Sequence, residues 1–94
     1  MGVILEFEWN VEKNELLRSE RGLSFDMVVK AINSGGLLND GPHPDAIRYP
    51  HQQMYVVLID GYVCMVPYVR SGDRVFLKTI FRNRKINRRY AGDL

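Results

Sequence analysis

Apolar and polar residues alternate at the start of the chain. In residues 3–9 every odd position is apolar and two of the even positions are glutamate. This period of two predicts a strand with one buried face. Asn10 follows as a candidate helix N-cap and Gly22 as a stop, so we expect the breaker-free residues 11–21 to form a helix.

The period then changes to that of an amphipathic helix. From Phe25 to Ile32 apolar residues recur at i, i+3, i+4 and i+7, with Ser24 as the expected N-cap and two glycines as the end. A stripe of this kind packs against a core. Residues 37–40 follow as a short candidate strand.

The second half of the chain predicts a series of antiparallel strands. An Asp-Gly pair at positions 60 and 61 is typical of a type I′ hairpin turn, and it joins two apolar runs, residues 53–60 and 62–70. A proline inside the second run predicts a bulge or a locally unpaired edge. After a further turn, residues 74–81 are expected to form the last strand.

The element order is therefore β-α-α-β-β-β, which indicates the α+β class. We expect an antiparallel sheet with both helices packed on one face. The 94 residues predict a single domain, residues 1–94, and a hydrophobic content of 46% is enough for one modest core. A chain of this length has little room for a deep cavity, so we expect a shallow groove as the site.

Cysteine content and hydropathy bear on where in the cell the protein is expected. Cys64 is the lone cysteine, which excludes an intrachain disulfide, and its apolar neighbours predict a buried side chain. The longest apolar stretches, residues 55–59 and 62–69, are far shorter than the ~20 residues of a membrane helix. The chain also has no apolar segment of the secretory type. We therefore expect a cytoplasmic protein without membrane contact.

Positive charge is concentrated near the end of the chain. Residues 70–94 hold eight of the thirteen lysines and arginines and two of the eleven acidic residues, a net charge of +6, whereas residues 1–69 carry −4. Six cations lie in the basic segment 78–90 with no acid between them. Such a patch attracts polyanions, because each phosphate that it neutralises releases condensed counterions. RNA or an acidic protein partner is therefore expected to bind this segment.

The start and the end of the chain resemble one protein family. Residues 7–10 and 22–25, Phe-Glu-Trp-Asn and Gly-Leu-Ser-Phe, with Lys13 between them, resemble the opening of BrnT-type toxins at the same spacing. Residues 76–85 resemble that family's final strand and its Ser-Ala-Arg-Lys-Ala-Thr signature. Members of the family often carry histidine where this chain has Arg21.

The resemblance implies a fold like that of the RelE and ParE toxins, with a small curved antiparallel sheet and two helices on one side. It implies a ribonuclease that inhibits translation as the toxin of a type II toxin–antitoxin pair. The implied partner is a cognate DNA-binding antitoxin that covers the active face, and any oligomer is expected to form through it. No cofactor is expected.

RNA cleavage without a metal needs a base for the 2′-hydroxyl, positive charge on the pentavalent phosphate and an acid for the leaving 5′-oxygen. By the resemblance, Arg84 and Lys85 would stabilise the phosphate, the arginine as a fork and the lysine as a point charge. A period of two places four residues on one strand face, namely Phe76, Lys78, Ile80 and Arg82. The expected RNA contacts are Lys78, Arg82, Arg88 and Arg89.

Candidates for proton transfer lie at two places. His43 and His51 belong to the Pro-rich connection 41–53, and His51, which precedes a strand, is the catalytic candidate because histidine titrates near neutral pH. An exposed loop histidine is the alternative. Tyr90 would donate a proton or stack on a base; Tyr68 would do the same unless it belongs to the core. The spacing of the histidines and the cysteine fits no metal site.

Two other functions fit the same sequence. One is a non-catalytic module that grips RNA, and the other is an antitoxin-binding protein that has lost toxicity. Cleavage of RNA separates the enzyme from both, and salt-sensitive RNA binding separates the first alternative from the second.

Overall fold

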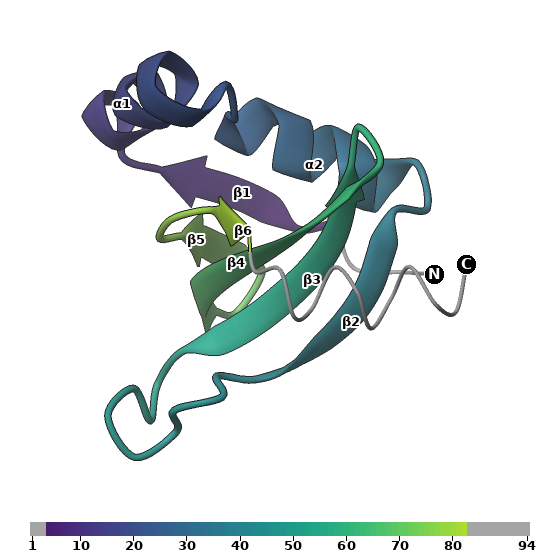
Figure 1. Ribbon diagram of the computed structural model, residues 1–94. Helices are drawn as coiled ribbons and strands as arrows, with labels where there is room; N and C mark the ends of the chain where they lie inside the picture. Colours follow the sequence, from purple (N-terminus) through teal and green to yellow (C-terminus); the bar gives the residue numbers. More distant parts are fainter. Residues whose placement is uncertain (1–3, 83–94) are drawn as a thin grey trace.

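The computed structural model describes residues 4–82, and within them two helices lie on one face of a six-stranded open sheet (Figure 1). This confirms the α+β class. The elements are β1 (Glu6–Trp9), α1 (Val11–Arg21), α2 (Phe25–Asn33), β2 (Leu37–Pro42), β3 (Gln53–Ile59), β4 (Tyr62–Ser71), β5 (Arg74–Leu77) and β6 (Phe81–Arg82).

The sheet is mixed, so the expected purely antiparallel sheet is wrong. The strand order is β1-β5-β4-β3-β2, and β6 pairs with β4 beside this path. Strand β1 runs parallel to β5, with Glu6 opposite Arg74 and Trp9 opposite Leu77, whereas the other pairs are antiparallel. The alternation of residues 3–9 indicates a strand but not the direction of its partner. The two helices give the chain the long crossover that a parallel pair needs.

Both helices begin at the expected caps. The Asn10 side chain accepts a hydrogen bond from the Lys13 backbone N–H at 2.9 Å, and the Ser24 hydroxyl accepts one from Met27 at 3.4 Å. Helix α1 ends at Gly22, whose φ of 66° lies in the left-handed region that glycine adopts without strain. Local sequence therefore decides where these two helices start and where α1 stops.

The β3–β4 hairpin also forms as expected. Asp60 and Gly61 have φ values of 51° and 82°, and positive φ at both central positions is the requirement of a type I′ turn. The pairing then runs without a register shift from Ile59 opposite Tyr62 to Gln53 opposite Tyr68.

The predicted last strand, residues 74–81, is instead two short strands. β5 ends at Leu77, opposite Tyr68, and β6 starts at Phe81, opposite Met65. Pro67 faces the gap between them: its carbonyl accepts a hydrogen bond from the Lys78 N–H at 2.8 Å, but it has no N–H to return. The predicted unpaired edge at this proline therefore lies on the β5–β6 side of β4.

The core lies between the helices and the sheet. Trp9 stacks on Phe25 with ring centroids 5.8 Å apart, which anchors the start of α2 on β1, the structural role that burial of an aromatic face favours. The fully buried side chains include Phe25 and Val28 of α2, Val57 of β3, Cys64 and Val66 of β4, and Val75 of β5.

Candidate nucleic-acid interface

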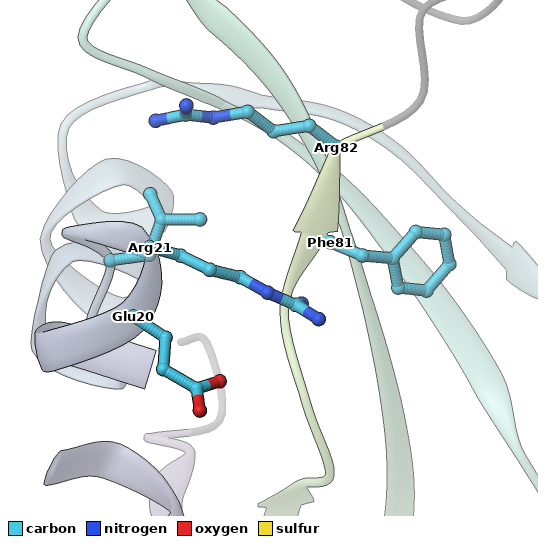
Figure 2. A pocket seen from close by; sticks show the side chains of 5 residues that line it. Glu20, Arg21, Phe81 and Arg82 are labelled. Atoms are coloured by element: carbon cyan, nitrogen blue, oxygen red, sulfur yellow. The ribbon is translucent and has the colours of Figure 1, made fainter. Parts of the chain in front are cut away.

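A shallow hollow of about 460 Å³ opens between the end of α1 and β6, and we call it the α1–β6 hollow (Figure 2). Its lining combines two guanidinium groups and one carboxylate with apolar side chains. The lining residues are Glu20, Arg21, Leu23, Phe81 and Arg82. The groove is shallow, as the chain length predicts, and its cationic side chains suit an anionic ligand.

Arg21 reaches across the hollow from α1. Its Nη1 donates a hydrogen bond to the Ile80 carbonyl oxygen at 2.7 Å, which ties the end of α1 to the chain just before β6. That carbonyl belongs to the segment between β5 and β6. Pro67 of β4 faces this segment and has no N–H to donate to it. A guanidinium carries five N–H donors in a fixed fork, so the remaining donors of Arg21 can bind a second oxygen-rich group.

Arg82 reaches into the same space from the opposite side. Figure 2 shows the side chains of Arg21 and Arg82 crossing between α1 and β6, while the Phe81 ring points away from α1. The Arg82 guanidinium carbon lies 4.5 Å from the centroid of the Tyr62 ring, a cation–π contact at the surface. This contact holds an exposed arginine in place without neutralising its charge.

Cys64 lies opposite Arg82 in the β4–β6 pair and is fully buried, as its apolar neighbours predict. Burial raises the pKa of the Cys64 thiol, and the nearby Arg82 opposes this shift only in part. The thiol therefore stays protonated near neutral pH and is not a ready nucleophile.

Lys78 does not line the hollow, and the predicted shared face of Lys78, Ile80 and Arg82 is wrong. Ile80 is fully buried while Lys78 and Arg82 are exposed. The period of two fails because the strand breaks between β5 and β6. The Lys78 ammonium instead lies 5.3 Å from the centroid of the Phe76 ring.

The two histidines also lie away from the hollow. Both belong to the connection between β2 and β3, which projects from the end of the sheet remote from α1 (Figure 1). His51 is exposed there. His43 is held locally, since its Nδ1 accepts a hydrogen bond from the Asp45 N–H at 3.0 Å and its ring centroid lies 4.6 Å from that of Tyr49.

Tyr68 belongs to the core, which was the alternative to a role in the site, and its exposed fraction is 1%. The other predicted site residues follow β6 directly in the sequence and lie outside the described residues. They are Arg84, Lys85, Arg88, Arg89 and Tyr90.

Sequence reasoning missed Glu20 and Arg21 as site residues. Their positions follow from the contact of Arg21 with Ile80, just before β6 and 59 residues further along the chain, and no local pattern encodes such a contact. One signal was present at Arg21, which stands where BrnT-type toxins often carry histidine.

Within residues 4–82 no three His, Cys, Asp or Glu side chains come together in an arrangement that could hold a metal ion. Neither α1 nor α2, the helices of this part of the chain, has the length and hydropathy to cross a membrane. Among the described residues, the ionisable groups that line the α1–β6 hollow are two guanidinium groups and a carboxylate.

No protein-family model matches the chain, and no curated protein matches it at a significant level. The resemblance to BrnT-type toxins stays a prediction from sequence.

Proposed function

We propose that this protein is the ribonuclease toxin of a type II toxin–antitoxin pair, with a RelE-like fold, acting on RNA in the cytoplasm without a metal ion. The observation that carries the proposal is the meeting of Arg21 and Arg82 in one hollow. The chain enters its most basic stretch immediately after this hollow.

Two arginines that line one hollow bind a phosphodiester group more favourably than they bind a single carboxylate group. Each guanidinium offers parallel N–H donors to two phosphate oxygens, and the pair supplies positive charge where the pentavalent phosphate gains negative charge. We assign the scissile phosphate to the space between Arg21 and Arg82.

The sequence that follows β6 would extend this site. In the proposal Arg84 and Lys85 complete the phosphate cluster, Arg88 and Arg89 contact neighbouring phosphates, and Tyr90 supplies a proton or a stacking surface. Lys78 and His51 lie outside the hollow, and their proposed part is limited to more distant RNA contacts.

The proposed partner is a cognate DNA-binding antitoxin, and this assignment rests on the sequence resemblance. An antitoxin that covers the α1–β6 hollow would neutralise its charge and block access of RNA. Inhibition of translation follows from cleavage of messenger RNA.

The test compares Arg82→Ala with Arg74→Ala in inducible expression and in cleavage of single-stranded RNA by the purified chains. Arg74 is a matched control because it is an exposed strand arginine that pairs with Glu6 and Glu8, at 3.8 and 4.0 Å, away from the hollow. We expect Arg82→Ala to lower the cleavage rate about a hundredfold, the usual loss of one transition-state donor. We expect it to relieve growth arrest, and Arg74→Ala to retain both activities.

If the unaltered chain leaves the RNA intact, the proposal of a ribonuclease is wrong. Equal losses in the two variants would show a non-specific effect of charge and leave the hollow without a role.

The second candidate function is an RNA-binding module without catalysis. It is favoured by the engagement of Arg21 with the Ile80 carbonyl and by the distance of both histidines from the hollow. Salt-sensitive binding of RNA that remains uncut would support this function, since phosphate contacts alone weaken as salt rises.

A further inference from the structure

Glu20 is a carboxylate at the edge of a cationic hollow, and it has no partner in the part of the chain that the structure describes. It lines the α1–β6 hollow beside Arg21 and Arg82, and it makes no ion pair or hydrogen bond with any side chain of residues 4–82. Figure 2 shows its side chain extending from the end of α1, on the α1 side of the hollow.

Arg21, the next residue along α1, forms no ion pair with Glu20, and the geometry of the helix explains why. Consecutive residues of an α-helix point in different directions, so Glu20 and Arg21 do not face each other. The guanidinium of Arg21 is in addition drawn toward the Ile80 carbonyl, 2.7 Å away. Among the described residues the carboxylate therefore has no ion-pair partner, although it lines the same hollow as Arg21 and Arg82.

Two other exposed acids of α1 and α2 are paired. Glu15 and Asp26 share Arg18, with N···O distances of 3.8 and 3.4 Å, so the cation nearest to these two carboxylates is already engaged. Glu20 is thus distinguished from the other acids of α1 and α2 by two facts together, its place in the hollow and its lack of a partner among the described residues.

We propose that Glu20 is the general base of RNA cleavage in the α1–β6 hollow. This inference rests on the proposed ribonuclease function and names the group that starts the reaction. With the phosphate between Arg21 and Arg82, the Glu20 carboxylate takes the proton of the 2′-hydroxyl. The 2′-oxygen attacks phosphorus, the bond from phosphorus to the 5′-oxygen breaks, and the leaving oxygen takes a proton from water. The products are a 2′,3′-cyclic phosphate and a 5′-hydroxyl, and Glu20 then returns its proton to water.

The test uses Glu20→Gln in the full chain, with Glu12→Gln as a matched control on the same helix but outside the hollow. Cleavage of a labelled single-stranded RNA is followed from pH 4.5 to 8.5, and binding is measured with the 2′-O-methyl form of the same RNA, which lacks the nucleophile. We expect Glu20→Gln to cleave about a hundredfold more slowly, within the usual range for loss of a general base, and to bind at least as tightly.

The pH profile separates a base from a structural residue. We expect the rate of the unaltered chain and of Glu12→Gln to rise with pH on the acidic side, and this rise to disappear in Glu20→Gln. Cleavage by Glu20→Gln at nearly the normal rate with an unchanged profile would overturn the assignment of Glu20 and leave the ribonuclease proposal standing. An unaltered chain that binds RNA without cutting it would overturn both.

Discussion

Tyr68 is a buried phenol whose hydroxyl is satisfied at the end of the sheet. Its O–H donates to the Asp40 carboxylate or to Oε1 of Gln53, which is 2.7 Å away, and its ring stacks on Tyr55 with centroids 3.9 Å apart. Burial raises the pKa of Tyr68 strongly, and the hydrogen bond to Asp40 adds to the rise. Burial also raises the pKa of Tyr55.

These shifts predict a loss of stability in alkali. Both phenols stay protonated in the folded chain at a pH where they ionise in the unfolded chain, whose ordinary pKa is about 10. The unfolded state therefore binds fewer protons above that pH, and the free energy of unfolding falls as pH rises. We expect urea midpoints to decrease from pH 9.5 to 11.5 and to decrease less steeply in Tyr68→Phe.

Tyr49→Phe is the control for this experiment, since Tyr49 lies in the β2–β3 connection. The urea midpoint of Tyr49→Phe should fall with pH as steeply as that of the unaltered chain. At neutral pH Tyr68→Phe should cost about 1 kcal/mol for the lost hydrogen bond. If the urea midpoint falls with pH equally steeply in the unaltered chain and in Tyr68→Phe, the raised pKa of Tyr68 is not a cause of the loss of stability.

Among the elements, α1 and α2 are joined by a buried amide. Asn14 of α1 is 5% exposed; its Oδ1 accepts a hydrogen bond from the Phe25 N–H at 2.7 Å, and its Nδ2 donates to Asp26 at 3.3 Å. The first N–H groups of a helix have no partner within the helix. Asn14 supplies one for α2 and so fixes the angle at which the two helices meet.

Asn14→Ala should therefore destabilise the fold by about 1–3 kcal/mol, because it leaves the buried Phe25 N–H without an acceptor. Chemical denaturation gives the free energy of unfolding directly. Asn33→Ala, at the exposed end of α2, should change it by less than about 0.5 kcal/mol. Equal effects of the two substitutions would show that the amide link is not important.

The sequence predicts those features of the elements that depend on neighbouring residues. The caps at Asn10 and Ser24 and the hairpin turn at Asp60 satisfy backbone groups a few residues away, so local chemistry specifies them. The parallel direction of β1 and the break after Leu77 depend on partners far along the chain. The hollow belongs to the second kind, which is why Glu20 was not predicted as part of it.

Over the whole molecule, charge is divided between the two parts of the chain. Residues 1–69 carry −4 and residues 70–94 carry +6, and Arg82 stands at the junction of the sheet with the basic end. Such a division attracts a polyanion to the basic residues of the chain rather than to its acidic part.

RNA affinity should consequently fall steeply with salt. If about four phosphates are neutralised, the logarithm of the association constant should decrease with the logarithm of salt concentration at a slope of about −3. Arg82→Ala should reduce that slope by nearly one, and Arg74→Ala should leave it unchanged. Fluorescence anisotropy with a 2′-O-methyl RNA at several salt concentrations measures both, and a flat dependence would exclude phosphate contacts.

The pairing of β1 with β5 has a consequence for the time at which the proposed site can form. Glu6 pairs with Arg74, and Arg21 contacts Ile80, 59 residues further along. Neither contact can form before the later residue has left the ribosome, and contacts so distant in sequence form slowly. A growing chain thus carries helices and a hairpin but no closed hollow. The proposed site is therefore absent from a nascent chain until the segment that carries Ile80 and β6 has left the ribosome.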